Sequence, residues 1–231
     1  MGTWFFTSDL HGHTDRYSKL FSLIRAEKPR AVLLGGDLLP NPYARVEGPE
    51  AAQQDFMGWL AREFQHIRQS LGDEAPEILL ILGNDDPRSE EQAVLEWDAQ
   101  GVWRYAHLRR LEVEGRSVVG YACVPPSPFL LKDWERYDVS RFVDPGCISP
   151  EEGQRTVAAE PDEVRYGTMA KDLEDLLGGQ DLSRAVLLFH APPYKGALDR
   201  AALDGKMVDH VPLDVHVGSI DIQRLIASRQ P

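Results

Sequence analysis

The chain has 231 residues, 42% of them hydrophobic, which is enough for one large α/β domain with a substantial core. A formal net charge of −12 disfavours nucleic acid as the substrate, because its phosphates would be repelled over most of the surface. The presence of only two cysteines argues against a disulfide framework. Residues 1–8 lack a signal-like leader, and no apolar run reaches membrane-spanning length. We therefore expect a soluble cytoplasmic protein without membrane contact.

The first predicted unit joins a strand to two metal-competent side chains. Residues 3–7 are rich in β-forming residues, and Asp9 and His11 follow them directly. Because these two residues are two positions apart in an extended segment, they point to the same side and can bind one ion. Apolar residues at helical spacing then predict a helix that is capped by Thr14 and runs to about Lys28.

The second unit places a carboxylate at the end of a buried strand. Val32 to Leu34 form the apolar strand, and Gly35 and Gly36 allow the backbone to bend sharply before Asp37. An acid in such a place is costly to bury without a partner, and a cation is the simplest partner, so we predict that Asp37 is a metal ligand. The strand, helix and strand form a βαβ unit, which puts both ligand loops at the same edge of a parallel pair.

The third unit repeats this pattern. A helix with one apolar face is predicted for residues 50–71, and residues 77–82 form a third buried strand. This strand leads into Gly83-Asn84-Asp85-Asp86-Pro87, which again offers metal-competent side chains. Ser89 and Gln92 form a capping box that predicts a helix to about residue 99.

The pattern changes in the middle of the chain. Alternating apolar residues over 102–124, interrupted at residues 114–116, predict a β-hairpin. Residues 125–167 are irregular and rich in proline, glycine and charge, and we expect an insertion that either covers the site or forms a disordered surface loop. Within this insertion, the residues considered for gripping a phosphate are Trp134, Arg136 and Arg141.

The last strand-end unit begins after a helix capped by Thr168 and ended by two glycines at 178 and 179. Residues 185–189 form a fourth buried strand that delivers His190, and Ser219 is predicted to cap a final helix ending near residue 228. Just beyond His190, Tyr194 and Lys195 are well placed to touch substrate. The remaining histidines considered are His13, His210 and His216, each either a surface or supporting group or a substitute ligand.

Four successive strand ends therefore present Asp, His or Asn side chains, which a chance distribution would seldom produce. Carboxylate, imidazole and amide ligands together suit Mn, Fe, Zn or Co, and a central carboxylate can bridge two ions. Two ions roughly 3.5–4 Å apart are the usual arrangement for phosphoester hydrolysis. The predicted metal ligands are Asp9, His11, Asp37, Asn84 and His190.

These motifs resemble, in order, the first four motifs of the calcineurin-like metallophosphoesterases. The motifs are Asp9-x-His11, Gly36-Asp37, Gly83-Asn84-Asp85-Asp86 and His190. The resemblance implies one domain spanning residues 1–231, built as a four-layer α/β/β/α sandwich of two mixed sheets. It also implies two divalent metal ions, the first held by Asp9, His11 and Asp37 and the second by Asn84 and His190, with Asp37 bridging.

Two positions depart from the family pattern. Asp85 stands where the family usually has a histidine that assists the leaving group, and a carboxylate there repels phosphate unless it is protonated or screened. The family's final Gly-His-x-His motif is missing, since His216-Val217-Gly218-Ser219 does not match it. We therefore expect a second sheet that is incomplete at the C-terminus, through truncation or a genuine absence. Its edge would be open to pairing or aggregation unless another chain, such as a second copy in a homo-oligomer, covers it.

The predicted function is the hydrolysis of a phosphomonoester or phosphodiester in a small phosphorylated substrate. A metal-bound hydroxide would attack phosphorus in line with the leaving oxygen. The predicted catalytic residues are Asp37 and Asp85, with Asp86 helping to orient water or ligands. The alternative is a scaffold that keeps the phosphoesterase fold for partner binding and has lost turnover, and a nuclease is a weaker third option.

Overall fold

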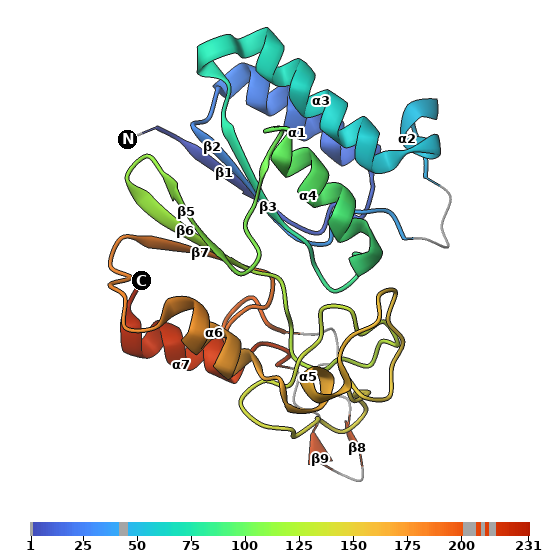
Figure 1. Cartoon of the computed structure of the whole chain (residues 1–231), viewed down its shortest axis with the longest axis vertical. Coiled ribbons are helices and arrows are strands. Elements are labelled where there is room, and N and C mark those ends of the chain that lie inside the picture. Colours follow the sequence, from blue (N-terminus) through green and yellow to red (C-terminus); the bar gives the residue numbers. More distant parts are fainter. Residues whose placement is uncertain (1, 42–45, 201–206, 209–210, 213–215) are drawn as a thin grey trace.

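The computed structural model describes residues 2–41, 46–200, 207–208, 211–212 and 216–231. Two β-sheets pack face to face in the middle, with helices covering the outer face of each (Figure 1). The predicted four-layer α/β/β/α arrangement is therefore confirmed. The N-terminal half of the chain supplies one sheet with its helices, and the C-terminal half supplies most of the other (Figure 1).

The first sheet is parallel throughout its described strands. Its strand order follows the chain, and the neighbours align so that Phe5 faces Val32 and Val32 faces Ile78. The central strands are buried because the sheet is covered on both faces, which explains their continuous apolar runs. Only the second sheet is mixed, contrary to the expectation of two mixed sheets. The strands are β1 (Trp4–Thr7), β2 (Ala31–Gly35), β3 (Glu77–Ile81) and β4 (Arg104–Tyr105).

The helices of the first half lie together on the outer face of this sheet (Figure 1). The single helix predicted over residues 50–71 is divided at Asp55, whose backbone is extended with φ −152°. The Asp55 carboxylate accepts a hydrogen bond from the Gly58 amide at 2.9 Å and so caps the second of the two helices. These helices are α1 (Thr14–Glu27), α2 (Glu50–Gln54), α3 (Phe56–Leu71) and α4 (Glu91–Ala99).

Two predicted helix caps are wrong. Thr14 is the first residue of α1, with His13 before it as the N-cap, and its hydroxyl donates to the carbonyl of Glu47 at 2.8 Å. Ser89 lies in a 3₁₀ turn, η2 (Arg88–Glu90), and its amide donates to Thr156 instead of forming a capping box. Both side chains make tertiary contacts that a local motif does not reveal. A second 3₁₀ turn, η1 (Gly72–Glu74), follows α3.

Aromatic side chains fill the space between α1 and α3. The ring of Tyr17 lies 5.6 Å from that of Phe56 and 5.8 Å from that of Trp59, in edge-on arrangements. The Tyr17 hydroxyl donates to the carbonyl of Leu38 at 2.9 Å, one residue beyond Asp37. This packing holds α1 against the loop that carries the predicted bridging acid. The predicted apolar face of α3 is buried at Phe56, Leu60, Phe64 and Ile67.

The second sheet combines a hairpin with a parallel strand. Glu114 and Gly115, with φ of 50° and 72°, form the tight turn of the predicted hairpin. The fourth predicted strand pairs in parallel with the hairpin and is largely half-buried instead of fully buried. The strands are β5 (Arg109–Val113), β6 (Arg116–Tyr121) and β7 (Ala185–Phe189), and a separate two-stranded ribbon is formed by β8 (Met207–Val208) and β9 (Val211–Pro212).

Two helices cover the outer face of the second sheet, and both predicted caps are confirmed. Thr168 accepts from the amide of Lys171, and Ser219 accepts from the amide of Ile222. These helices are α6 (Met169–Leu177) and α7 (Ile220–Arg229). None of the helices in the described part of the chain is long and apolar enough to cross a membrane.

The irregular segment 125–167 packs at one end of the molecule and includes the short helix α5 (Pro161–Tyr166) (Figure 1). It contains side chains that are completely buried, including Lys132 and Trp134. The ammonium of Lys132 forms a 2.6 Å ion pair with Glu135, which is also buried. The alternative of a disordered surface insertion is therefore wrong.

His107 lies in this core, between the two sheets and the irregular segment. Its ring packs edge-on against Trp134 with centroids 5.1 Å apart, and its Nδ1 accepts a hydrogen bond from the Ala122 amide at 3.0 Å. Burial, together with the charges of Arg88 and Arg136, lowers the pKa of His107 from 6.5 to about 3. The folded protein thus holds His107 neutral.

We predict that His107 makes the protein less stable in acid. Since the pKa is about 3 when folded and about 6.5 when unfolded, the unfolded chain binds the extra proton between these values, and stability falls as the pH drops through this window. Between pH 7 and pH 5 the unfolding free energy should fall by about 2 kcal/mol more than in His107→Asn. Urea unfolding at both pH values measures this, with exposed His66→Asn as the control. If the unfolding free energy fell equally between pH 7 and pH 5 in His107→Asn and in the unaltered protein, the prediction would be wrong.

Candidate metal centre

The loops after β1 and β2 continue to hydrogen-bond to each other beyond the strands. The amide of Asp9 donates to the carbonyl of Gly36 at 3.0 Å, and that of His11 donates to the carbonyl of Asp37 at 2.8 Å. Asp9, His11 and Asp37 all have left-handed backbone, with φ of 56°, 46° and 53°. Such conformations are strained for residues other than glycine and tend to gather at functional sites.

This backbone brings three side chains together. One ligand atom from each of Asp9, His11 and Asp37 lies within 4.8 Å of the others. Asp9 is exposed, His11 is partly exposed and Asp37 is buried, so the group opens to solvent on one side. Two carboxylates and one imidazole at this spacing form a candidate metal site.

Asp37 is the most buried member, with 5% of its surface exposed. Its Oδ1 accepts a hydrogen bond from the Asp85 amide at 2.9 Å and lies 3.4 Å from His190 Nε2, while its Oδ2 lies 3.9 Å from His11 Nε2. Burial alone would raise the pKa of Asp37, but the hydrogen bond and charge of His190, with the Asp85 amide, hold that pKa below its usual value. Asp37 is therefore held as a carboxylate.

His190 approaches Asp37 from the second sheet. Its Nδ1 lies 2.8 Å from the carbonyl of Gly35, and its Nε2 lies 3.1 Å from Asn84 Oδ1. Burial would lower the pKa of His190, but Asp37 and the Gly35 carbonyl raise it to about 9. A metal ion bound at Nε2 would take the place of the proton that this environment favours.

Asp85 stands at the exposed side of the group. Its Oδ1 accepts from the side-chain amide of Asn84 at 2.9 Å, and its Oδ2 lies 3.8 Å from His11 Nδ1. Burial and the nearby charge of Asp37 raise the pKa of Asp85. The side chain is 52% exposed, which leaves it accessible to a substrate.

Asp86 supports the loops that carry two of the predicted ligands. It is completely buried, and its carboxylate accepts from the backbone amides of Leu38, Leu39 and Gly83 at 3.1, 2.7 and 2.9 Å. Burial and the charge of Asp37 raise the pKa of Asp86 to about 7. By joining the loops after β2 and β3 it holds Asp37 and Asn84 close together, in line with the predicted role of orienting ligands.

Two glycines allow the loops to approach this closely. A methyl group on Gly83 would overlap Asp37 and His190, and one on Gly36, where φ is 98°, would overlap His190 and Gly83. The sequence pointed to the Gly35-Gly36 bend but not to the steric requirement at Gly83. That requirement arises because three separate loops meet at this residue.

Arg16 also reaches this region and was not anticipated. Its guanidinium Nη1 donates to the carbonyl of Asp9 at 2.8 Å and so supports the strained loop from the first helix. The signal in the sequence is weak, because an arginine near the start of an exposed helix face is common.

The predicted substrate contacts lie beside a second histidine. The ring of Tyr194 packs edge-on against His216 at 5.6 Å, and the Lys195 ammonium lies 5.2 Å from the Tyr194 ring centre. His216 Nδ1 lies 2.8 Å from the buried carboxylate of Asp199, so its contact is with an acid outside the metal-competent group. Contact of Tyr194 and Lys195 with substrate remains a prediction. His13 is exposed at the N-cap position of α1 and its side chain makes no capping hydrogen bond, and His210 lies outside the described residues.

The three residues considered for a phosphate grip have structural partners. Trp134 is fully buried, Arg136 pairs with Glu163 and Asp172, and Arg141 pairs with Glu151. Their predicted role over the site is therefore not supported.

The donor set fits divalent metal ions. Five carboxylate, imidazole and amide side chains from four strand ends converge, and the most buried acid is kept ionised. A buried carboxylate flanked by Asp9 and Asp85 gathers negative charge that a divalent cation would neutralise. The mixture of ligands suits first-row transition metals.

The fold and the site together define a two-sheet α/β protein with a candidate metal centre at the carboxyl ends of its strands. The family model described as calcineurin-like phosphoesterase matches residues 4–211, and the chain belongs to this family. The family supports a metal-dependent phosphoester hydrolase, in agreement with the resemblance noted in the sequence.

Solved structures agree on the fold. One crystal structure is 17% identical in sequence with a TM-score of 0.56. The match covers 100% of this chain and 82% of the chain in that structure. The crystal structure of TT1561 of Thermus thermophilus is also 17% identical, with a TM-score of 0.50, and covers 100% of this chain and 78% of its own. No curated protein matches the chain. At these identities the likeness shows the fold alone.

We predict that Gly83→Ala weakens metal binding by about tenfold or more, because the added methyl group pushes the Asp37 and His190 loops apart. Isothermal titration with Mn²⁺, together with thermal unfolding, measures the effect. Gly179→Ala is the control, since no atom lies within 4 Å of its added methyl group. Unchanged Mn²⁺ affinity in Gly83→Ala would show that the close approach of these loops has no role in binding.

Proposed function

We propose that this chain hydrolyses phosphomonoesters or phosphodiesters at a site for two divalent ions. One observation carries the proposal, which is that the two oxygens of Asp37 face different donors. Oδ2 faces His11 at 3.9 Å and Oδ1 faces His190 at 3.4 Å, as a bridging carboxylate requires. The first ion would be held by Asp9, His11 and Asp37, and the second by Asp37, Asn84 and His190.

The ions are proposed to be Mn, Fe, Zn or Co. When bound, two such ions activate water as a nucleophile near neutral pH and neutralise the charge of the phosphate. Around them, Asp37 stays ionised, His190 is oriented by its contact with the Gly35 carbonyl, and the strained loop fixes Asp9 and His11. This preorganisation supports turnover over the alternative of an inactive scaffold.

Asp85 is proposed to act on the exposed side of the site, where its carboxylate contacts Asn84 and faces His11. Its negative charge disfavours a phosphate unless the acid is protonated or screened, so we propose that the natural substrate has a good leaving group. Tyr194 and Lys195 are proposed to contact the substrate, with the Lys195 ammonium as the cation for a phosphate.

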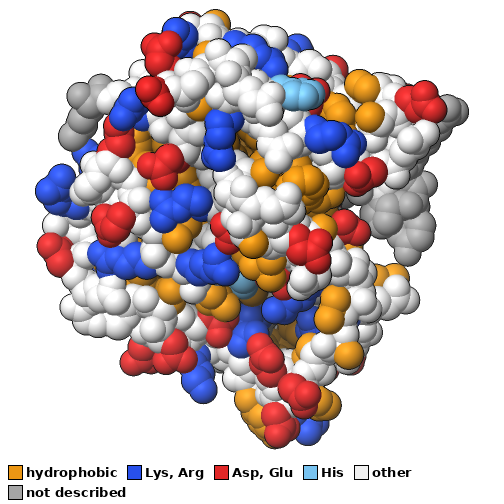
Figure 2. Space-filling view, turned by 45° about the horizontal axis from the view of Figure 1, so that its top comes forward, with side chains coloured by type: hydrophobic (Ala, Val, Ile, Leu, Met, Phe, Trp, Pro, Cys, Tyr) orange, Lys and Arg blue, Asp and Glu red, His pale blue; other side chains and the backbone are white. Residues whose placement is uncertain are grey.

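The substrate is proposed to be small. The net charge of −12 opposes a polyanion, and the face shown in Figure 2 carries acidic and basic side chains next to one another and no continuous basic surface. The low cysteine content, with Cys123 and Cys147 both free, supports a reducing, cytoplasmic setting.

We expect Mn²⁺-dependent hydrolysis of bis-p-nitrophenyl phosphate or p-nitrophenyl phosphate, and a loss of at least about 100-fold in Asp37→Asn, because the bridging charge is removed. Product release is followed by absorbance with and without the metal. Asp98→Asn is the matched control, because Asp98 pairs with Arg109 on the surface. Hydrolysis that is independent of the metal, or unaffected in Asp37→Asn, would refute the proposal.

We also expect Asp85→Asn to lower KM for p-nitrophenyl phosphate by about fivefold, because one negative charge near the phosphate is removed. With this good leaving group kcat should change little, and steady-state kinetics separates the two constants. A large fall in kcat with unchanged KM would instead assign Asp85 a proton-transfer role.

A further inference from the structure

The loop that carries Asn84 and Asp85 is held on two sides. On one side the buried Asp86 carboxylate binds the backbone amides of the loops after β2 and β3, including that of Gly83. On the other side three hydrogen bonds from residues of the irregular segment 125–167 reach Asp86 in this loop and the 3₁₀ turn η2 directly after it. We call the residues that make these bonds, Asp133, Trp134 and Thr156, the outer brace.

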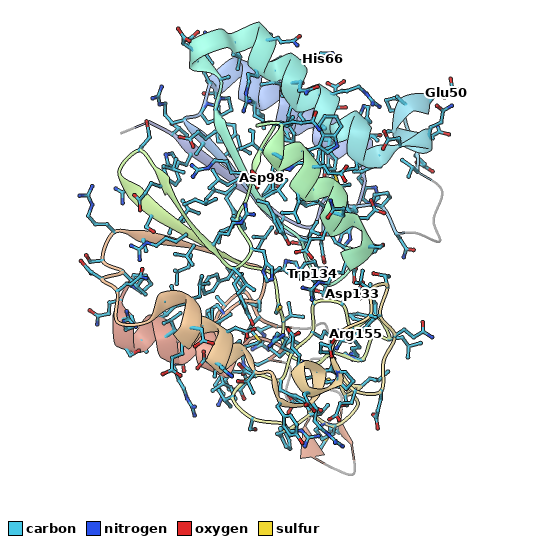
Figure 3. The ribbon with its side chains drawn as sticks, in the orientation of Figure 1. Glu50, His66, Asp98, Asp133, Trp134 and Arg155 are labelled. Atoms are coloured by element: carbon cyan, nitrogen blue, oxygen red, sulfur yellow. The ribbon has the colours of Figure 1, made fainter. Side chains whose placement is uncertain are left out.

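Each bond of the outer brace ends within five residues of Asn84 along the chain. The indole of Trp134 donates to the carbonyl of Asp86 at 2.8 Å. The carboxylate of Asp133 accepts from the Arg88 amide at 2.8 Å, and the hydroxyl of Thr156 accepts from the Ser89 amide at 3.0 Å. Asp133 also accepts from the amide and the hydroxyl of Thr156, so these two residues support each other. Figure 3 shows Asp133 and Trp134 together near the start of α4.

The packing around these bonds is tight. Trp134 has 0% of its surface exposed, and the Arg88 guanidinium lies 5.0 Å from the centre of its ring. The cavity bordered by Arg88, Asp133 and Arg155 measures about 20 Å³, which is room for about one water molecule. The Trp134 indole is therefore enclosed where it donates to the Asp86 carbonyl.

The outer brace is itself anchored by a buried ion pair. Lys132 and Glu135 flank Asp133 and Trp134 and pair at 2.6 Å, and the Lys132 ammonium also donates to the carbonyl of Ser127 at 2.9 Å. The backbone of Trp134 accepts from the Val124 amide at 2.9 Å, just beyond β6. Breaking a buried pair is strongly unfavourable, so this segment is a firm support.

We infer that the outer brace positions the metal centre. Asp86, Arg88 and Ser89 are two, four and five residues beyond Asn84, so the brace decides where the Asn84 amide oxygen stands relative to His190. It acts through the loop and touches neither ion nor substrate, in the manner of the outer contacts that tune metal sites. The inference rests on the proposed function, because it assigns the brace to the second of the two ions.

The test compares two buried tryptophans. Trp134→Phe removes the bond to Asp86, whereas Trp103→Phe removes an equivalent bond, from the Trp103 indole to the Val94 carbonyl at 3.0 Å, inside the core. In Mn²⁺ titrations we expect Trp134→Phe to lower the affinity for the second ion by about tenfold or more and to leave the affinity for the first ion unchanged. Trp103→Phe should leave both affinities unchanged, even though it lowers thermal stability.

A second measurement does not depend on metal. In the metal-free protein, hydrogen exchange of the backbone amides at residues 83–86, 88 and 89 should be faster in Trp134→Phe and unchanged in Trp103→Phe. Thr156→Val, at an exposed residue, should shift both the exchange and the second Mn²⁺ affinity in the same direction by a smaller amount.

The results separate the brace from the proposed function. The inference about the brace would be overturned if the amide hydrogen-exchange rates over residues 83–89 did not change in Trp134→Phe. It would also be overturned if Trp134→Phe lowered the affinities for both ions equally. If the unaltered protein binds none of Mn²⁺, Fe²⁺, Zn²⁺ and Co²⁺, the proposed function fails, and the exchange measurement still decides whether the brace holds the loop.

Discussion

The structure depends on one buried carboxylate. Asp37 sits where the two sheets meet, and taking such a charge out of water costs several kcal/mol unless partners compensate for it. Its partners come from the loops after β1, β3 and β7, namely His11, the Asp85 amide and His190. His190 also contacts the Gly35 carbonyl and so links the second sheet to the first. The need to compensate the buried charge of Asp37 therefore holds the ends of β1, β2, β3 and β7 together.

The backbone accommodates this arrangement at several points. Three site residues adopt left-handed conformations, and Gly36 and Gly83 leave room that a side chain would occupy. Strain of this kind persists only when the surroundings enforce it. Here the surroundings include the ladder between the first two ligand loops and the three amides bound by Asp86. Two buried carboxylates of one site thus have opposite pKa shifts, since the pKa of Asp86 is raised and that of Asp37 is lowered.

The irregular segment shows how a long loop can be stabilised with little regular secondary structure. Its hydrogen bonds join backbone groups, such as those of Lys132 and Gln154, and also buried side chains, most clearly the paired Lys132 and Glu135. Buried pairs add little net stability compared with apolar packing, but they hold a unique arrangement when every polar atom has a partner. The segment therefore offers a precise surface to the ligand loop, which a flexible insertion would not do.

The sequence by itself determined the four apolar strands, the parallel pairing of the first two, the hairpin and the family, together with the five side chains that converge. These follow from local apolar runs and from polar residues at strand ends, which obey general rules for βαβ units. The roles of these side chains as metal ligands remain predictions. Only the tertiary structure decided the break at Asp55, the burial of Asp86, the pairing of His216 with Asp199 and the contact of Trp134 with Asp86. Trp134 and Asp86 are 48 residues apart, and Gly35 and His190 are 155 apart. Such contacts depend on how whole layers pack, and no local pattern of residues records that.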